Sequence, residues 1–430
     1  MAILLTIWVL LIIFLAFFNL KYCVCFYMAY MILVPFLNIN IGGISLQYNL
    51  VNTVIVIGFV VKYYNSLKHI DFRSFKSFIF LYVFYLVMMP LQSFPLSISL
   101  NSWRINVMLT LLFPIIVWNI YRFDKTLYKP LKYTFIICIF ITLVYGLLLT
   151  QIPGLNPYLM LILPINGAEF NDLYAFADDG RVFGRISSVF GHPMTFGLVL
   201  CLSIIFIYSI SKNMNKYCRV LLLIMCVLNI LFCGVRSAIA GTLIGVVMYI
   251  FLSKKIKLAA ITIIVFICLA QVVQIIPGME DYVSSIVDFD GKNQVVSGSS
   301  KDMRLEQLNG ALEEISSSPL IGKGYGWVSN YLSVKGDHPV LLAFESLIFI
   351  VLCDNGLLGI IAWLISIYLY YRQVRIYRDQ WKILLVLYLT YIIYSCITGE
   401  YGYLKYMLLF YTIMLINSEE NKVKIKNIRQ

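Results

Sequence analysis

Long runs of hydrophobic residues recur along the chain, and short polar segments separate them. The first run, Ala2 to Leu20, is hydrophobic on every face of a helix, whereas strands of a membrane β-barrel alternate between hydrophobic and polar residues. A helix of about 20 mostly hydrophobic residues can cross the hydrocarbon core of a bilayer. The pattern therefore predicts spanning helices at about 2–20, 22–37, 49–65, 76–92, 104–121, 133–151, 194–211, 218–233, 237–252, 258–276, 340–370, 383–397 and 403–417.

The composition excludes a soluble globule. Hydrophobic residues make up 61% of the 430 residues and charged residues only 13%, which is about half the charged fraction of ordinary soluble domains. No basic residue precedes the first run and no small-residue cleavage site follows it, so we expect a retained helix rather than a signal peptide. The sequence predicts an all-α polytopic integral membrane protein, with twelve or thirteen transmembrane helices in a single domain over residues 1–430.

Basic residues are concentrated in alternate short loops. Lys and Arg in such loops mark the cytoplasmic side of a membrane protein, so we expect six segments, including the C-terminal tail, to be cytoplasmic. The net charge of +12 then reflects membrane topology, and no nucleic-acid partner is expected. The six segments are 62–76, 122–132, 212–219, 254–257, 372–382 and 422–429.

Two long loops, at 152–193 and 277–339, carry many of the acidic residues and are predicted to face outward. Within the second loop, the segment from Asp302 to Ser317 has the hydrophobic spacing of one helix face, at Leu305, Leu308, Leu312 and Ile315. Ser318-Pro319 would end this amphipathic helix, and three glycines that follow favour a tight turn. We therefore expect the loop over 277–339 to form a structured cap above the active site.

The end of the first outer loop carries two arginines and a histidine that lead directly into a helix. Arg181, Arg185 and His192 lie within 12 positions of one another, and the backbone N–H groups of a helix start suit an anion. The alternative is that the two arginines pair with Asp178 and Asp179 and that His192 only opens the helix.

Two further arginines lie on the same predicted side of the membrane. Arg236 follows a very short turn between two hydrophobic helices, where a guanidinium fork could hold a phosphate or diphosphate bidentately; the alternative is a snorkelling contact with lipid headgroups. Arg304 lies on the predicted cap helix, where it could instead form an ordinary ion pair with a neighbouring glutamate.

Asp337-His338 stands where the second outer loop re-enters the membrane. The ordinary pKa of histidine lies nearest neutrality, so His338 could accept a proton from a hydroxyl group; a solvated loop histidine is the alternative. Of three histidines, two lie on the outer side. No phosphate loop, metal-binding motif or cysteine pair accompanies them, so neither a metal nor a cofactor is expected.

Taken in order, these motifs resemble the O-antigen polymerase and O-antigen ligase family of bacterial polysaccharide assembly. The resemblance covers roughly residues 180 to 365. It rests on five segments: Arg185-Ile-Ser-Ser-Val-Phe-Gly-His192-Pro193, Gly234-Val-Arg236-Ser-Ala238, Arg304 to Ile315, Ser318-Pro-Leu-Ile-Gly-Lys-Gly-Tyr-Gly326 followed by His338, and Asp354-Asn-Gly-Leu-Leu-Gly359.

The resemblance implies glycosyl transfer from a polyprenyl (undecaprenyl) diphosphate-linked oligosaccharide, at the outer face of the bacterial inner membrane. Arg236 and Arg304, with Arg185 as a third, would stabilise the diphosphate that leaves. His338 would be the base, with Asp337 or Glu345 as alternatives, and direct displacement would invert the anomeric centre.

A polymerase of lipid-linked repeat units for O-antigen or capsule is the preferred function. A ligase that moves the finished glycan to another acceptor is the alternative within the family; a polysaccharide or lipid transporter and a membrane scaffold are the alternatives outside it. The polymerase would work in contact with membrane lipid, and with the flippase and chain-length regulator of the same pathway.

Overall fold

The computed structural model describes residues 1–34, 38–41, 44–152, 154–166, 185–210, 214–253, 256–275, 301–377 and 380–428. Each of the thirteen hydrophobic runs contains helix, and the segment 104–121 is built from two helices joined by a π-helical turn at Val107–Leu112. The all-α class is confirmed. The helices of these runs are α1 Ala2–Phe18, α2 Leu20–Leu33, α3 Tyr48–Lys62, α4 Lys76–Met88, α5 Leu96–Asn106, α6 Phe113–Phe123, α7 Tyr128–Leu149, α10 Pro193–Ile210, α11 Lys216–Phe232, α12 Arg236–Ser253, α13 Ile256–Gln274, α17 Leu347–Val374, α18 Trp381–Ile397 and α19 Leu404–Ile428.

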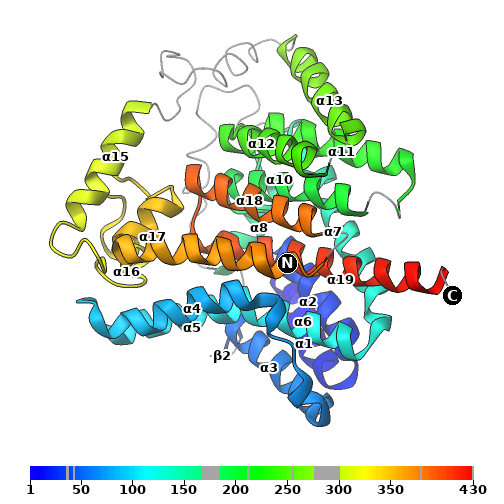
Figure 1. Ribbon diagram of the computed structural model, residues 1–430, viewed down its shortest axis with the longest axis horizontal. Coiled ribbons are helices and arrows are strands. Elements are labelled where there is room, and N and C mark those ends of the chain that lie inside the picture. Colours follow the sequence, from blue (N-terminus) through cyan, green and yellow to red (C-terminus); the bar gives the residue numbers. More distant parts are fainter. Residues whose placement is uncertain are drawn as a thin grey trace.

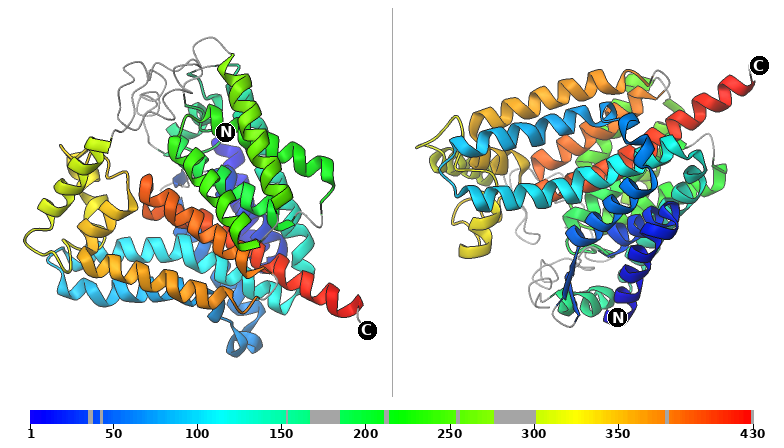
Figure 2. Two further views of the ribbon diagram at one scale, coloured as in Figure 1. Left: turned by 45° about the horizontal axis from the view of Figure 1, so that its top comes forward. Right: turned by 90° about the horizontal axis from the view of Figure 1, so that it is seen from below.

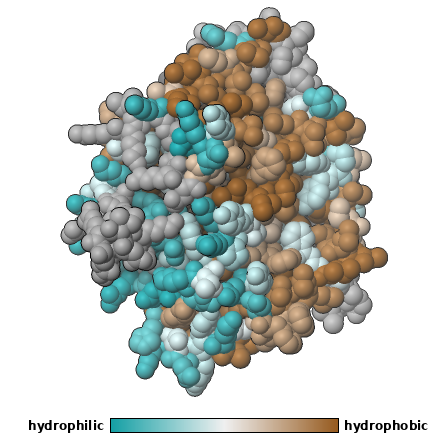
Figure 3. Space-filling model, turned by 90° about the vertical axis from the view of Figure 1, so that its right-hand side faces the viewer, coloured by the Kyte–Doolittle hydropathy of each residue, from teal (hydrophilic) through white to brown (hydrophobic). Residues whose placement is uncertain are grey.

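Hydrophobic helices of spanning length confirm a multi-pass membrane protein. Among the described residues, six helical segments are long and apolar enough to cross a bilayer, and several shorter apolar helices accompany them. Large hydrophobic side chains such as Ile3 and Phe251 lie on the outside with more than three quarters of their surface exposed, which is stable only against lipid. Seen from the end that is on the right in Figure 1, hydrophobic side chains form a broad area beside a polar one (Figure 3).

The predicted cytoplasmic segments of the N- and C-terminal parts meet at one end of the bundle. The guanidinium of Arg122 donates to the carbonyl of His69 (3.0 Å), and the hydroxyl of Tyr121 donates to Glu420 (2.9 Å). Lys21 forms an ion pair with Asp124 (3.2 Å), which brings the junction of α1 and α2 to the same end.

The opposite end carries the connections that the sequence predicts to be outside. Two helices of the second outer loop, α15 Lys301–Glu314 and α16 Trp327–Lys335, lie beside the start of α17 and near the turn between α4 and α5 (Figure 1). The N–H of Phe94 in that turn donates to the carbonyl of Lys323 (3.2 Å). Smaller elements elsewhere are α8 Pro157–Ile162 and the antiparallel strands β1 Asn38–Ile41 and β2 Ile44–Gln47.

The cap helix forms as predicted, but its hydrophobic stripe is only partly buried: Ile315 is buried and Leu308 packs against the protein, whereas two leucines are exposed. Leu305 and Leu312 are 50% and 46% exposed, whereas Gln307 and Ala311 are fully buried. The reason lies in Gly310, where an added Cβ would stand only 2.9 Å from Val340. The small-residue face of α15 packs against the protein, because small residues allow close approach, and Leu305 and Leu312 are left outside.

The core lies around α10. This helix packs against α11, α12, α18 and α19, and its residues from Phe196 to Tyr208 are all buried. Its start, the start of α12 and the end of α18 lie side by side (Figure 1; Figure 2, left). The N-terminal helices α1 to α3 are inclined to the rest (Figure 2, right). Three segments remote in sequence therefore meet at the predicted outer end.

The predicted span at 340–370 begins too early. Residues 338–346 form a turn, in which His338 and Leu342 exchange two backbone hydrogen bonds of 2.9 Å, and α17 begins only at Leu347. The hydrophobic character of this turn, which includes Leu341 and Phe344, reflects burial under the cap rather than membrane contact.

Candidate functional site

The segment that leads into α10 has an arginine at one end and a histidine at the other, and its middle is anchored in the bundle. The hydroxyl of Ser188 donates to a carbonyl of α7 (2.6 Å), and the side chain of Asn156 donates to the carbonyl of Ser188 (2.8 Å). Phe190 is fully buried. Arg185 and His192 are each only partly buried, so the anchored middle presents the two basic groups at the start of α10.

His192 caps α10 and is uncharged. Its Nδ1 accepts the N–H of Met194 (3.1 Å), which satisfies one of the free donors at the helix start. Burial, assisted by the charge of Arg185, lowers the pKa of His192 to about 4. Because Nδ1 accepts a hydrogen bond, the proton of the neutral ring is on Nε2. His192 is therefore a neutral N–H donor close to Arg185.

Arg236 is the first residue of α12. Gly234, with φ of +67°, reverses the chain between α11 and α12, a conformation that glycine adopts without steric cost. The two neighbours of Arg236 in sequence are buried, whereas Arg236 itself is half-buried. Helices α10 and α12 approach closely beside it, since a Cβ on Gly197 would lie 3.0 Å from the Cβ of Ala238. Arg236 thus lies where α10, α12 and α18 meet.

Arg304 projects from the first turn of α15 towards Glu345, which precedes α17. Its Nη2 lies 3.6 Å from Oε2 of Glu345, and its Nη1 donates to Gln307 (3.0 Å). The two charged side chains are 25% and 30% exposed. Desolvation lowers the pKa of the Arg304 guanidinium, and the charge of Glu345 opposes that change. Arg304 stays a cation, poorly hydrated yet within reach of solvent.

Glu345 is tied by its backbone to the end of α18. The N–H of Gly399 donates to the carbonyl of Glu345 (2.9 Å), and the hydroxyl of Ser346 donates to the carbonyl of Cys396 (2.6 Å). These bonds fix the Arg304 partner against the helix end that also packs beside α12.

The next residue after Gly399 is a glutamate that sequence reasoning did not single out. Glu400 is exposed to solvent, yet surrounding protein desolvates its carboxyl and raises its pKa, and Lys405 opposes this. Both glutamates act on Tyr403: burial raises the pKa of its hydroxyl, and the charges of Glu400 and Glu345 raise it further. A hydrogen bond with Thr195, at the start of α10, lowers the pKa of the Tyr403 hydroxyl.

Backbone strain is concentrated in the loops that carry these groups. Among the described residues, the non-glycine residues with positive φ are Ser188 (52°), Leu342 (50°) and Phe344 (51°). One lies between Arg185 and His192, and two lie between His338 and Glu345. Such conformations each cost of order 1–3 kcal/mol and persist where surrounding structure enforces them, often at functional sites.

The glycine-rich segment 318–326 is hydrogen-bonded to the break in α17, and the two together are called the joint. Gly356 has φ of 61° and ψ of −159° inside α17, which leaves helical backbone groups without their usual partners. The segment supplies those partners: the N–H groups of residues 357 and 358 donate to carbonyls of residues 319 and 320, and those of 323 and 324 donate to carbonyls of 353 and 354, at 2.8–3.0 Å. The family-like motifs at 318–326 and 354–359 therefore bind each other.

Asp354 completes this joint by capping α16. Its buried carboxylate accepts the backbone N–H groups of Gly326 and Val328, both at 2.9 Å. Gln92, from the turn after α4, donates to the carbonyl of Asp354 (3.0 Å) and accepts the N–H of Tyr325 (3.1 Å). The cap is thus attached to two membrane helices through buried polar groups.

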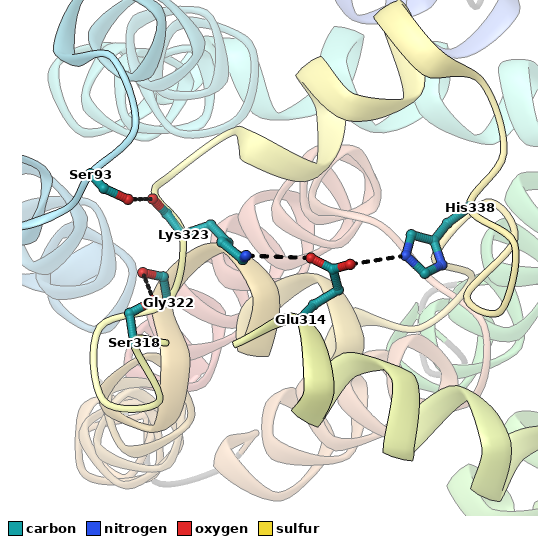
Figure 4. A network of polar contacts seen from close by, with 6 residues as sticks. All are labelled: Ser93, Glu314, Ser318, Gly322, Lys323 and His338. Carbon is teal, nitrogen blue, oxygen red and sulfur yellow. Dashed lines mark hydrogen bonds and ion pairs between the residues drawn. The ribbon is translucent and has the colours of Figure 1, made fainter. Parts of the chain in front are cut away.

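His338 has both ring nitrogens occupied. Nδ1 accepts the N–H groups of Val340 (3.1 Å) and Leu341 (3.0 Å), so the proton of the neutral ring is on Nε2. Nε2 faces Glu314 at 3.3 Å, and the other oxygen of Glu314 lies 3.5 Å from Lys323 (Figure 4). The histidine joins its own turn to the end of α15.

The structure brings some of the predicted residues together and sets others apart. Ten residues of helix, about 15 Å at about 1.5 Å each, separate Arg304 from Glu314, so His338 lies towards the other end of α15. Asp337 is exposed at the end of α16, and Arg181 lies outside the described residues. The missed Glu400 did carry a signal: it follows a hydrophobic run on the predicted outer side, in a chain with few acidic residues.

Among the described residues, no group of three or more His, Cys, Asp or Glu side chains is placed to hold a metal ion. Residues 220–364 match the family model described as O-antigen ligase. The match runs from α11 into α17; it includes Arg236, Arg304, His338 and Glu345 and leaves out His192 and the other residues before 220. Curated proteins give no match to the chain.

Proposed function

We propose that this protein polymerises lipid-linked oligosaccharide repeat units into a surface polysaccharide, because its residues 220–364 match the family model described as O-antigen ligase. The family supports a membrane enzyme of polysaccharide assembly. The observation that carries the proposal is the convergence of arginines from separate segments: Arg185 beside the start of α10, Arg236 at the start of α12, and Arg304 through Glu345 at the end of α18.

These arginines meet the electrostatic requirement of the reaction. When the bond between the sugar and the diphosphate breaks, negative charge develops on an oxygen close to lipid, where charge is poorly solvated. Cations already in place stabilise that charge without reorganisation, and one such contact is worth about 10²–10³ in rate. The partly desolvated Arg304 and the half-buried Arg236 suit this role. His192 adds a neutral donor for a sugar or phosphate oxygen.

The donor is an oligosaccharide carried on undecaprenyl diphosphate, whose activated leaving group removes any need for a nucleotide. The acceptor is the terminal sugar of the next repeat unit, and direct displacement inverts the anomeric carbon. Within this proposal the active site faces the periplasm or exterior of the inner membrane and the C-terminus is cytoplasmic. A flippase would supply the donor, and a chain-length regulator would limit the product.

His338 keeps a place in the proposal, with a role taken from its contacts. Its Nδ1 supports the strained turn that leads to Glu345, and its Nε2 holds the end of α15 through Glu314. We therefore assign it to positioning Arg304 and Glu345. Proton acceptance by His338 stays a prediction, since Nε2 would first have to lose its proton.

The test is glycan length in cells that lack the gene and are complemented with wild type, Arg236→Ala, Arg304→Ala or Arg104→Ala. Arg104 is an exposed arginine of α5 that bonds to Asn101, and it serves as the matched control. We expect wild type and the control to restore a ladder of chain lengths, and the two site variants to leave a single repeat unit on its acceptor.

Other outcomes would replace the proposal. Full-length lipid-linked chains that never reach an acceptor in the deletion strain would identify a ligase. A normal ladder in both site variants would remove the arginines from the mechanism. Unchanged glycan in the deletion strain, with loss of a lipid or sugar transport activity, would favour a transporter.

A further inference from the structure

The proposed transfer needs a group that takes a proton from the acceptor hydroxyl, and neither outer histidine is arranged to do so. A base must offer a lone pair to the proton it removes. In His192 and His338, Nδ1 already accepts backbone N–H groups, so Nε2 carries the proton in the neutral ring. Both rings can donate a hydrogen bond from Nε2, but neither can accept one there.

The carboxylates around this end differ in their partners. Glu345 is paired with Arg304 at 3.6 Å, and Glu314 lies between Lys323 and His338. Each of these two carboxylates therefore already has a cation or an imidazole as its partner. Asp354 is buried and accepts two backbone N–H groups. Each of these three carboxylates therefore already has an ion-pair or hydrogen-bond partner in the protein.

Glu400 has the opposite environment. Among the described residues, its carboxylate has no hydrogen bond and no ion pair within 4.0 Å, and it is exposed to solvent. The charged and titratable groups that face it are Lys405, Tyr403 and, across Tyr403, Glu345. Desolvation nevertheless raises its pKa, and a carboxylate with a raised pKa is a stronger base.

The backbone next to Glu400 is bonded to the partner of the arginine that the proposed function uses. Gly399, its neighbour, donates to the carbonyl of Glu345, and Glu345 pairs with Arg304. On the other side, Tyr403 connects Glu400 to Thr195 in the first turn of α10. Glu400 thus follows directly on the residue that bonds to Glu345, and its charge acts on Tyr403, which also hydrogen-bonds to Thr195.

We propose that Glu400 is the general base of this enzyme and binds the acceptor sugar through its attacking hydroxyl. The hydroxyl oxygen forms the new bond to the anomeric carbon as its proton passes to the Glu400 carboxylate. The bond from that carbon to the diphosphate oxygen breaks, and its electron pair remains on the diphosphate beside the arginines. This role rests on the proposed function and adds a catalytic residue from outside the matched domain.

The experiment uses the full chain in membranes. Membranes of the deletion strain, which contain its lipid-linked repeat units, are fused with vesicles carrying purified wild type, Glu400→Gln, Glu400→Asp or Glu306→Gln. Glu306 is an exposed glutamate of α15 and provides the matched control. Rate is followed as lengthening of the glycan at several concentrations of repeat unit and at pH 5 to 8.

We expect Glu400→Gln to lower kcat by about 10²- to 10⁴-fold, the usual contribution of a general base, with KM changed little. Wild type should lose rate as the pH falls through the raised pKa of Glu400, and the residual rate of the Gln variant should lack that dependence. Glu400→Asp should recover part of the rate, and the control should match wild type.

Each other result decides the matter. A kcat of Glu400→Gln within threefold of wild type, or an unchanged pH dependence, overturns the role of Glu400 and leaves the proposed function standing. A rise in KM with normal kcat assigns Glu400 to binding alone. A variant that loses its thermal unfolding transition assigns it to folding. Absence of transfer by wild type overturns the proposed function and this role with it.

Discussion

The joint between α17 and the cap gives the sharpest test of how the structure holds the site. At Gly356, an added Cβ would lie 2.5 Å from the carbonyl carbon and oxygen of Leu320 and 2.6 Å from the backbone nitrogen of Gly322. All three are backbone atoms that cannot rotate away. Gly356→Ala must therefore separate the segment 318–324 from α17 or distort both.

The cost can be worked out from the contacts. Alanine in this backbone region costs about 1–3 kcal/mol, and the four backbone hydrogen bonds of the joint are worth about 0.5–1.5 kcal/mol each. Their loss brings the total to about 3–9 kcal/mol, a large part of the about 5–15 kcal/mol that stabilises a typical fold.

Gly336 offers a control with almost the same dihedral angles. Its φ and ψ are 75° and −151°, close to the 61° and −159° of Gly356, but nothing lies within 4 Å of an added Cβ. Gly336→Ala should therefore cost only the backbone term of about 1–3 kcal/mol. The difference between the two variants isolates the collision.

The assay is thermal unfolding of both purified variants in one detergent, together with protease sensitivity of the segment 318–335 and glycan lengthening in cells. We expect Gly356→Ala to unfold at a clearly lower temperature, to be cut in the cap and to lose lengthening, while Gly336→Ala stays active. If the two variants unfold at the same temperature and both remain active, the joint does not hold the site and the steric reasoning is wrong.

Three further predictions follow from single side chains. The side-chain oxygen of Asn can take the place of Nδ1 of His338, whereas the oxygen of Gln cannot. His338→Asn should therefore keep most of the activity, and His338→Gln should lose it. Equal loss of activity in both variants in glycan assays would favour the role of His338 as base. In Asp354→Asn the side-chain NH2 faces one of the two N–H groups that the carboxylate accepts, so the substitution should cost about 2 kcal/mol and expose α16 to protease. The pKa of His192 is lowered to about 4 in the folded protein, so as the pH falls the unfolded chain takes up a proton on this ring before the folded protein does. The free energy of unfolding should therefore be full above about pH 6.5 and fall by about 3 kcal/mol towards pH 4. His192→Asn should flatten this pH dependence in unfolding measurements.

Hydrophobic periodicity and charge predicted much of the fold because lipid leaves the backbone few options. All thirteen runs contain helix, and predicted cytoplasmic ends from both halves of the chain meet, as the contact of Tyr121 with Glu420 illustrates. Hydrophobicity alone could not distinguish burial in lipid from burial in protein, so the turn before Leu347 was included in a span. For the same reason the hydrophobic spacing of α15 does not show that Leu305 is exposed, because the small Gly310 decides which face of the helix packs.

The site was harder to predict because its geometry depends on backbone contacts between distant segments. The arginines could be singled out, since charge at a membrane boundary is costly. The tautomer of His338 could not be predicted, because it is set by two N–H groups of a turn that the hydrophobic pattern assigned to a spanning helix. The segment of Glu400 is connected to the Arg304 pair only through the bond from Gly399 to Glu345.

The motif residues divide by what they contact, and this division makes the site testable as a whole. Ser188, Gly356 and Asp354 contact backbone, so replacing them should lower stability and activity together. Arg236 and Glu400 are presented at helix ends with part of their surface open to solvent, so replacing them should lower activity while leaving the unfolding temperature nearly unchanged. Under the proposed function, a strained and rigid frame would hold these charges in position before the donor binds, and such preorganisation is what electrostatic catalysis depends on.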